Sequence, residues 1–523
     1  MATIYQSNIG PFGDMESLSI PQFMVRYNPD EVASEKIVHL DTFSKDPITY
    51  GSLRHDAGHG AWGLRNKLNL QPGDILLALI PNSNVFVLLA HATWWAGAVF
   101  APLNTSSTEK DIAHVINLIR PTHIATVESK LRAVQQAMAS KFPLDVIGTE
   151  DQHLAPYDLQ GKSAKETAST ICFSSGTTGK MKGVLLSHYN MIMNSLQLRN
   201  SMPLRLNATV REVWFSPYCH IYGLASVVFS GMWVGALYLG QPAFELKAFC
   251  QKASEIHATD MHLVPPVAIS LTSQSVEDYD LSSVQRVLIA AAPLKVALQQ
   301  QLQKRFPQAS ICQGYGLTEC SPGVLHQIDD DGSNCGSVGR LLIGTEARLV
   351  DPMTRKDVKP GEEGELWVRG PQVMMGYIND PASTKETFTD GWLRTGDILK
   401  IDQNGNFWIT DRLKEIAPSE LEDTLLRHPD VTDAAVCAVY DDSQATEVPL
   451  AYVSLVANKV HLPESNKRAV LARIGEWVNG QVAGYKKIRG GVFHLQEIPK
   501  TPTGKIQRRL LPAKVQERRE NQL

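Results

Sequence analysis

The chain has 523 residues, of which 43% are hydrophobic and 20% are charged, a composition typical of an ordinary globular protein. Its length predicts roughly two to four domains with ample core. The formal net charge of −4 excludes the overall basic field of many nucleic-acid-binding proteins. The seven cysteines are scattered and form no C-x-x-C pair, which argues against a zinc site or a disulfide framework.

Two stretches bear on membrane association. The N-terminus, Met-Ala-Thr-Ile-Tyr-Gln, has no basic region followed by an apolar run, so we expect no signal peptide. Val85–Leu103 is long and apolar, but it contains His91 and two tryptophans and is followed by Asn104. We therefore expect a buried helix that runs into a strand, and no transmembrane segment.

The pattern along most of the chain alternates between helical and strand periodicity, which predicts parallel, doubly wound sheets of the α/β class. Helices are predicted over Tyr50–Leu70, Asn82–Gly97, Asp111–Leu118, Lys130–Phe142, His188–Arg199, Tyr222–Gly235, Phe244–His257, Pro266–Ser273 and Leu294–Phe306. Strands are predicted over Ile75–Ile80, Val99–Leu103, Thr170–Phe173, Glu212–Ser216, Ala236–Leu239, His262–Val264, Arg286–Ala291 and Ile311–Gly314.

The pattern changes after Gly339. Short β-like runs alternate with turn signals, which predicts a small β-rich subdomain with strands at Glu346–Val350, Gly364–Arg369 and Phe407–Thr410. A smaller α+β unit follows, with helices predicted at Ser419–His428 and Ser465–Asn479 and strands at Ala434–Val439, Ala451–Val456 and Gly491–Leu495. The predicted domains are residues 1–412 and 413–523.

The stretch Thr170–Gly183 contains three glycines, five hydroxyl residues and two lysines. Glycines allow tight turns and close approach to a ligand, and consecutive backbone N–H groups in such a loop can hold an anion. The loop is not a Walker A motif, because the spacing of Gly176, Gly179 and Lys180 differs from that motif. It is either a polyphosphate-binding loop or a flexible polar surface loop.

Two further glycine-containing motifs place carboxylates beside hydroxyls. Gln313–Glu319 ends in a Thr-Glu pair, which is either a magnesium site beside phosphates or an exposed turn. In Thr395-Gly-Asp397, a glycine turn holds an aspartate that either accepts hydrogen bonds from a diol or forms an Asx-turn.

Three other segments carry candidate groups. Asp411-Arg412-Leu-Lys414 places alternating charges at the boundary between the large and small units. These charges belong either to a functional site or to a surface ion-pair cluster. Lys505 ends a loop with two prolines and is either a mobile charge for a phosphate or carboxylate, or a solvent-facing lysine. His220 is a core histidine or part of a pocket wall, since no Gly-x-Ser-x-Gly nucleophile elbow is present.

Taken together and in order, these motifs resemble the adenylate-forming superfamily of acyl-CoA synthetases, luciferases and peptide-synthetase adenylation domains. The resemblance extends from about Ile48 to Leu511 and is greatest to the 4-coumarate–CoA ligase-like branch, judging from His220-Ile-Tyr-Gly and Asp411-Arg-Leu-Lys-Glu415. It implies an ATP-dependent ligase in which a carboxylic acid forms an acyl-adenylate that coenzyme A, or a carrier-protein thiol, then captures. The C-terminal domain would be mobile.

The resemblance also implies the roles of individual residues. Lys505, Thr318, Glu319 and His220 would be catalytic, and Glu319 would hold Mg2+. The positions that would bind ATP are Ser174, Ser175, Gly176, Thr177, Thr178, Gly179, Lys180, Lys182, Gly314, Tyr315, Asp397 and Arg412. The positions that would line the pocket for an aryl or medium-chain acid are His220, Tyr222, Ser226, Ala290, Gly316, Pro322 and Gly323.

The chain departs from the family pattern after Glu415. It passes from Glu415-Ile416 directly to Ala417-Pro-Ser-Glu-Leu-Glu422, about eight residues short of the usual hinge loop. The alternatives are an enzyme that stops at acyl-AMP or delivers it to a carrier protein, and a non-catalytic nucleotide-binding protein. We expect no nucleic-acid partner, because the basic residues near the C-terminus coincide with the Lys505 motif. The chain ends without Ser-Lys-Leu, so a cytoplasmic location is expected over a peroxisomal one.

Overall fold

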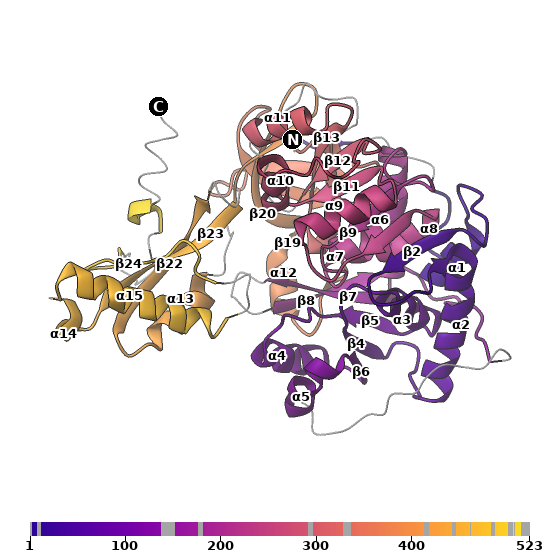
Figure 1. The fold of residues 1–523 in the computed structure, drawn as a ribbon, viewed down its shortest axis with the longest axis horizontal. Helices are drawn as coiled ribbons and strands as arrows, with labels where there is room; N and C mark the ends of the chain where they lie inside the picture. The colour runs from indigo at the N-terminus through magenta and orange to yellow at the C-terminus, as the bar shows by residue number, and fades with distance from the viewer. Residues whose placement is uncertain are drawn as a thin grey trace. The chain divides into compact units, whose positions relative to one another are not determined.

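The computed structural model in Figure 1 divides into two compact units. The first comprises Met1–Thr105, Glu109–Ser174 and Gly183–Arg412, and the second comprises Leu413–Leu523 with Ser106–Thr108 and Ser175–Lys182. The structure describes residues 3–7, 12–137, 152–175, 181–290, 296–327, 336–412, 418–441, 446–460, 462–482, 487–499, 506 and 508–513.

The first unit contains a six-stranded sheet with the order β18-β8-β7-β5-β4-β6. Its strands are β4 (Ile75–Leu79), β5 (Val99–Pro102), β6 (His123–Thr126), β7 (Ala168–Ser175), β8 (Met181–Ser187) and β18 (Gly376–Tyr377). Strands β4, β5, β6 and β7 pair in parallel, and β18 pairs antiparallel with β8. The three strands predicted for this region are confirmed, whereas β6, β8 and β18 have no counterpart among the predicted elements.

Helices connect these strands, as the alternating pattern predicts (Figure 1). They are α2 (Tyr50–Asn66), α3 (Asn84–Trp95), α4 (Glu109–Ile119), α5 (Glu128–Ala137) and α6 (His188–Ser201), preceded by α1 (Ile20–Arg26). Ser83 caps α3 by accepting a hydrogen bond from the Phe86 N–H, and the helix is buried along most of its length. The interpretation of Val85–Leu103 as a buried helix running into a strand is confirmed. Among the described residues, no helix has the length and apolar character needed to cross a membrane.

Two further sheets contain parallel strands. The sheet β3-β2-β10-β9 is made of β2 (Ile37–Asp41), β3 (Ile48–Thr49), β9 (Arg211–Trp214) and β10 (Leu237–Gly240). The sheet β11-β12-β13-β14-β15 is made of β11 (Asp260–Leu263), β12 (Arg286–Ile289), β13 (Ser310–Gly316), β14 (Gly323–His326) and β15 (Arg340–Leu341). The associated helices are α9 (Leu246–Glu255), α10 (Pro265–Ser273) and α11 (Val296–Arg305). Strands β11, β12 and β13 are parallel, and β14 and β15 continue the sheet antiparallel.

The apolar helix predicted at Tyr222–Gly235 is present but is not a regular α-helix. It consists of α7 (Ile221–Gly223), the π-helical segment η1 (Leu224–Gly231) and α8 (Met232–Val234). At its start, a Cβ on Gly223 would lie 2.6 Å from the Pro217 carbonyl oxygen, so the chain approaches too closely there for any other residue. Hydrophobic periodicity marks the helix but does not distinguish an i→i+5 segment from an i→i+4 one.

The β-rich subdomain is an antiparallel sheet with the path β1-β16-β17-β20-β19, in which β21 also pairs with β20. Its strands are β1 (Tyr5–Gln6), β16 (Glu346–Val350), β17 (Gly364–Arg369), β19 (Phe388–Thr389), β20 (Trp392–Ile401) and β21 (Phe407–Arg412), and α12 (Pro381–Thr387) precedes β19. The prediction that Thr395-Gly-Asp397 is a turn is wrong. These residues lie within β20, where the register with β17 shifts and Gly396 takes a φ of +77°, so the glycine forms an irregularity within the strand.

The second unit contains the three-stranded sheet β22-β23-β24. Its elements are α13 (Pro418–Leu426), β22 (Val431–Asp441), β23 (Thr446–Leu455), α14 (Ala457–Val460), α15 (Glu464–Asn479), β24 (Val492–His494) and the short turn η4 (Arg508–Leu510). Leu425, Val453 and Ile474 are buried in a core that joins α13 and α15 to the sheet. The predicted α+β pattern of this region is therefore confirmed, although β22 and β23 are longer than the predicted strands.

Candidate active site

The candidate site lies where parallel strands of three sheets end. Strand β7 ends at Ser175, β9 ends at Trp214 and is followed by His220, and β13 ends at Gly316. In α/β proteins, ligands bind outside the carboxyl ends of parallel strands, because loops with free backbone groups leave the sheet there. The sequence-predicted residues Ser174 and Tyr315 are each the last residue but one of such a strand.

Glu319 is held by two hydroxyl groups from one of these sheets. Its Oε1 accepts hydrogen bonds from Ser174 Oγ at 3.1 Å and from Tyr377 Oη at 2.9 Å. Burial, and secondarily the negative charge of Glu319, raises the pKa of Tyr377, which therefore remains a neutral donor. Hydrogen bonds to a charged acceptor contribute about 1.5–3 kcal/mol each, so these two fix the position of the carboxylate.

Asp397 is held in a similar way by an aromatic hydroxyl. Tyr315 Oη, on buried Tyr315 of β13, donates to Asp397 Oδ2 at 2.5 Å. The Asp397 N–H donates to Thr395 Oγ1 at 3.1 Å within the irregular part of β20. Asp397 is paired with Arg412 of β21 in the strand register. The two positions predicted to hold a ribose are therefore directly opposite each other in the sheet.

The segment Tyr315–Glu319 links these two groups. Tyr315 joins the sheet of β13 to the β-rich sheet through Asp397, and Glu319 joins it to the sheet of β7 and β18. Thr318, beside Glu319, is buried. Three sheets therefore converge on a run of five residues that the sequence singled out as a glycine-containing motif.

The glycines of this motif are required by close packing. A Cβ on Gly316 would lie 2.3 Å from the Pro322 carbonyl oxygen, and one on Gly314 would lie 3.2 Å from a carbon of the His326 ring. Gly316 is paired with Gly323 in the register of β13 and β14. A Cβ on Gly323 would lie 2.8 Å from Leu342 Cδ1, so the neighbouring core already fills that space. Glycine at these positions allows β14 to lie against β13 where the register shifts.

His220 begins the helical segment that follows β9. Its Nδ1 accepts a hydrogen bond from the Tyr222 N–H at 3.3 Å, so the ring caps α7. The residue reaches solvent, yet the protein atoms around the ring are close enough to desolvate it and lower the pKa of His220. His220 is therefore neither a fully buried core histidine nor a freely solvated one, and its pKa direction favours the neutral ring.

Tyr222 is surrounded by polar and aromatic groups that the sequence did not single out. Its ring centroid lies 5.2 Å from that of Trp214 and 5.7 Å from that of His262. His262 is fixed by Glu212, which is fully buried, through a 2.6 Å contact between Nδ1 and Oε2. No local pattern marks Glu212 or His262, because strands β9 and β11 bring them together over fifty positions of sequence.

Two polar atoms in this region are buried without a hydrogen-bond partner among the described residues. They are Tyr222 Oη and His326 Nε2. Burial lowers the pKa of His326 to about 3, with a further contribution from the charge of Arg205, so its ring is neutral near pH 7. Buried polar atoms are almost always paired in native proteins, so a bound ligand group or a water molecule would satisfy each of these two.

The remaining predicted residues are placed as follows. Ser226 lies in η1, Ala290 follows β12, Pro322 is buried, and Lys182 is half-buried on β8. Gly176, Thr177, Thr178, Gly179, Lys180, Lys505, Glu415 and Ile416 lie outside the described residues, as do the side chains of Ser175 and Arg412. Their proposed roles therefore remain predictions.

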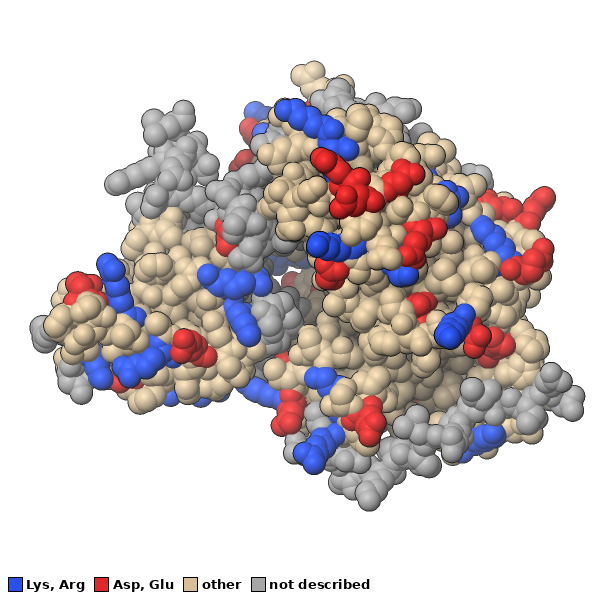
Figure 2. Space-filling model, viewed as in Figure 1, with Lys and Arg blue, Asp and Glu red and all other residues tan. Residues whose placement is uncertain are grey.

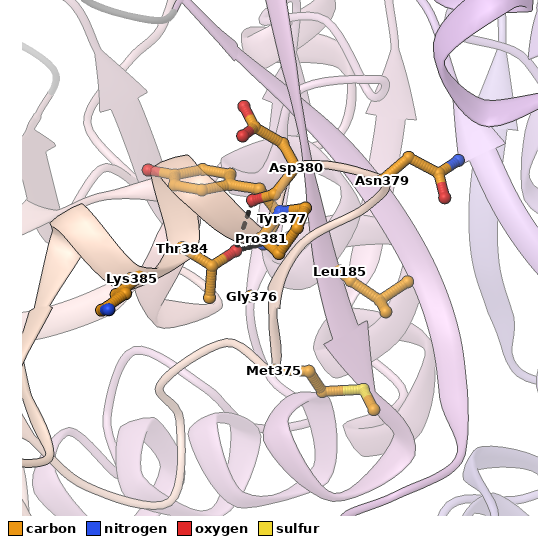
Figure 3. A pocket seen from close by; sticks show the side chains of 9 residues that line it. All are labelled: Leu185, Met375, Gly376, Tyr377, Asn379, Asp380, Pro381, Thr384 and Lys385. Carbon is orange, nitrogen blue, oxygen red and sulfur yellow. Dashed lines mark hydrogen bonds between the residues drawn. The ribbon is translucent and has the colours of Figure 1, made fainter.

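Figure 3 shows an open hollow of about 430 Å3 next to Tyr377. It is lined by Leu185, Met375, Gly376, Tyr377, Asn379, Asp380, Pro381, Thr384 and Lys385. The Tyr377 N–H donates to Thr384 Oγ1 at 2.9 Å, which fixes β18 against α12. None of the sequence-predicted site residues lines this hollow, and Tyr377 is the only lining residue that also contacts Glu319 among the described contacts.

Comparison with known proteins identifies the class. The AMP-binding enzyme model matches residues 25–378, and the model of the AMP-binding enzyme C-terminal domain matches residues 420–505. The chain belongs to the AMP-binding enzyme family, which is the adenylate-forming superfamily that its motifs resemble.

Individual relatives define the branch. The chain is 34% identical over 503 residues to peroxisomal OPC-8:0-CoA ligase 1 of Arabidopsis thaliana, covering 91% of this chain and 90% of the relative. It is 32% identical over 502 residues to 4-coumarate–CoA ligase 2 of Nicotiana tabacum, covering 90% of each. The structure of o-succinylbenzoate CoA synthetase from Bacillus subtilis has the same fold, with a TM-score of 0.78, 22% identity and coverage of 95% and 99%. The chain is thus a member of the 4-coumarate–CoA ligase-like branch and an AMP-forming acid–thiol ligase.

Proposed function

We propose that this enzyme activates an aryl or medium-chain carboxylic acid and transfers it to coenzyme A. In the first step the carboxylate attacks the α-phosphorus of ATP, and the bond to pyrophosphate breaks. In the second step the sulfur of coenzyme A attacks the acyl carbonyl carbon, the thiol proton is lost, and AMP leaves. The two steps yield one acyl-CoA, one AMP and one pyrophosphate for each ATP.

The nucleotide would be held by the two hydrogen-bonded groups described above. Asp397 and Arg412 would bind the ribose, with Tyr315 fixing the Asp397 carboxylate. Ser174, Ser175, Gly176, Thr177, Thr178, Gly179, Lys180 and Lys182 would cradle the phosphates, together with Gly314 and Thr318. Lys505 would neutralise the charge that develops between the carboxylate and the α-phosphate, where a positioned cation has most effect on rate.

The residues around Glu319 fit a magnesium ion. Mg2+ prefers oxygen ligands and is commonly held by one or two carboxylates together with substrate phosphates. Glu319 offers a carboxylate that Ser174 and Tyr377 orient. Thr318, whose side chain carries a hydroxyl group, directly precedes it. A bound ion there would neutralise phosphate charge as pyrophosphate leaves. The protein's part is to keep the carboxylate in one position.

The observation that carries the proposal is the convergence of three sheets on Tyr315–Glu319. It supports a polar, pre-arranged nucleotide site at the ends of parallel strands, which is where this fold class binds ligands. A surface turn would not need a buried tyrosine on one side and a half-buried carboxylate with two hydroxyl donors on the other.

The acyl group would lie along His220, Tyr222, Ser226, Ala290, Gly316, Pro322 and Gly323. The buried Tyr222 hydroxyl and His326 Nε2 favour an acid that carries a hydrogen-bonding group away from its carboxylate, since such a group would satisfy one of them. The relatives are named for 4-coumarate, a hydroxylated aryl acid, and for OPC-8:0. A matched pair of acids with and without a distal hydroxyl is therefore the most informative substrate comparison.

Pyrophosphate release tests the proposal. Purified full-length protein is incubated with ATP and Mg2+ and a panel of aryl and medium-chain acids, with and without coenzyme A. We expect acid-dependent pyrophosphate release, faster with coenzyme A and accompanied by acyl-CoA. If coenzyme A neither accelerates pyrophosphate release nor yields a thioester, the enzyme stops at acyl-AMP. No release with any acid would contradict the proposal.

A further inference from the structure

Helix α2 carries two histidines on one face, in the first unit and apart from the residues assigned to the active site (Figure 1). His55 and His59 are four residues apart, which brings their side chains together on a helix. Their Nε2 atoms are 3.1 Å apart. His59 is only 6% exposed, whereas the side chain of His55 is 63% exposed, so the pair has one anchored ring and one at the surface.

The other nitrogen of each ring faces an oxygen. His59 Nδ1 lies 3.0 Å from the Gln152 carbonyl oxygen, and His55 Nδ1 lies 3.3 Å from Asp56 Oδ1. Both oxygens can only accept, so a hydrogen on each Nδ1 matches these contacts, and that tautomer leaves a lone pair on each Nε2. Two lone pairs then face each other at 3.1 Å. That arrangement is repulsive unless a proton or a metal cation lies between them.

A third imidazole lies beside this pair. The His153 ring is centred 5.2 Å from the His59 ring and 6.0 Å from the His55 ring. Its Nε2 lies 2.0 Å from the position that a Cβ on Gly58 would occupy, so this ring is accommodated because residue 58 is a glycine. The Leu154 N–H donates to the Gly58 carbonyl oxygen at 3.1 Å, which ties the segment to α2.

We propose that His55 and His59 chelate a borderline transition-metal cation, Zn2+ or Ni2+, through their Nε2 atoms, with His153 recruited as a third ligand. With metal–nitrogen bonds of about 2.0–2.1 Å, two ligands at a tetrahedral angle are separated by about 3.4 Å, close to the spacing already present. Among the described residues, no three His, Cys, Asp or Glu side chains are already arranged around one metal position. The pair therefore supplies two ligands at a spacing that is already present. His153 would have to reorient in the metal-bound state to become the third ligand, and water would complete the coordination.

The contacts to the two Nδ1 atoms support this assignment. In metal sites a ligating histidine usually donates its other N–H to a carboxylate or backbone carbonyl, which fixes the tautomer and raises the basicity of the ligand. Asp56 and the Gln152 carbonyl occupy these two roles. Because His153 and the Gln152 carbonyl lie on one segment and the chelating pair on α2, a bound cation would cross-link that segment to the helix.

The test uses full-length protein treated with a chelator and titrated with Zn2+ and separately with Ni2+, without nucleotide, by isothermal calorimetry. We expect one site whose affinity falls at least about tenfold in His55→Asn and in His59→Asn, and less in His153→Asn. His257→Asn is the matched control, since His257 is an exposed single histidine with a φ of +49° that asparagine accepts. The control should bind as the wild type does.

A second readout distinguishes metal binding at these histidines from metal binding at cysteines or at the proposed nucleotide site. The cation should raise the midpoint of thermal unfolding of the wild type and of His257→Asn, but not of His55→Asn, because a ligand that binds only the folded state stabilises it. His55 is exposed, so this variant should fold normally. Equal affinity in His55→Asn and the wild type would overturn the proposal. So would the absence of metal binding, in which case a proton shared between the two rings accounts for the short contact.

Discussion

The two ends of the candidate active site differ in how completely their polar groups are paired. At the nucleotide end, Glu319 accepts two hydroxyl hydrogen bonds and Asp397 accepts one from Tyr315. At the acyl end, the Tyr222 hydroxyl and His326 Nε2 are buried without a partner among the described residues. Under the proposed function, the nucleotide end would be pre-arranged for charges that are the same in every reaction cycle, whereas the acyl end would have hydrogen-bonding capacity that a particular substrate satisfies.

Glu212 and His262 show that the acyl end is nevertheless rigid. Glu212 is fully buried and contacts both the backbone N–H and the ring of His262, and His262 packs against Trp214 and Tyr222. The orientation of the Tyr222 ring is thus fixed even though its hydroxyl is unpaired. If the acyl group lies against Tyr222 as proposed, a donor held in one orientation would discriminate against acids that lack the matching group.

Figure 2 shows where charged side chains lie on one face of the first unit. On the visible face of the first unit, acidic and basic side chains are interspersed. The described residues of that face therefore carry no large surface field of one sign.

The largest effect is expected for Lys505→Ala. If the nucleotide end orients ATP but Lys505 supplies the charge at the reacting centre, adenylation should fall by about 10²–10³ while ATP binding is retained. Acid-dependent pyrophosphate exchange and ATP calorimetry measure the two properties separately. Lys514→Ala, in the same basic segment, is the control. Exchange near the wild-type rate in Lys505→Ala would refute the assignment.

Glu319→Gln is expected to have the next largest effect. The amide keeps the shape of the side chain but removes the charge, so we expect a loss of about 10² in the adenylation rate and a higher Mg2+ concentration for half-maximal rate. The measurement is the rate of pyrophosphate release as a function of Mg2+. An unchanged Mg2+ dependence would show that Glu319 does not hold the ion.

Tyr377→Phe should have a smaller effect in the same direction. It removes one of two hydrogen bonds to Glu319, and because Ser174 still holds the carboxylate we expect a loss near the lower end of the about 1.5–3 kcal/mol range, which is roughly tenfold in rate. The Mg2+ dependence should shift as in Glu319→Gln but less. A rate loss without any change in Mg2+ dependence would indicate that Tyr377 serves only to fix β18.

Tyr222→Phe is the matched substitution at the acyl end and should have the smallest effect on the common chemistry. Because the hydroxyl has no partner among the residues that the structure describes, its removal should leave the free energy of unfolding unchanged or raise it by about 1 kcal/mol. The ratio of kcat/KM for an acid with a distal hydroxyl over the same acid without it should fall several-fold. A clear loss of stability would show that the hydroxyl is paired within the protein and would remove the difference between the two ends.

Much of the fold could be predicted because hydrophobic periodicity is local. The helices at His188–Arg199 and Ser465–Asn479 and the strands at Glu346–Val350 and Gly364–Arg369 agree closely with the structure. Short strands such as β6, with no strongly apolar run, were missed. The irregularity at Thr395–Asp397 was read as a turn, because a glycine with positive φ serves both in turns and within bulged strands.

The site was predictable only where the chemistry lies in a contiguous motif. Tyr315 and Glu319 were identified because they share a glycine-containing segment. Tyr377, Glu212, His262 and His326 were not, since each acquires its role from a partner on a distant strand. The segment after Glu415 is about eight residues shorter than the family's hinge loop, and this difference bears on the proposed thiol-transfer step.

The central claim is that the enzyme completes both half-reactions, and the products of one reaction with ATP, Mg2+, coenzyme A and an accepted acid test it most directly. Quantified by mass spectrometry, acyl-CoA and AMP should form in equal amounts, with little acyl-AMP remaining. Accumulation of acyl-AMP in the presence of coenzyme A, without thioester, would contradict the claim.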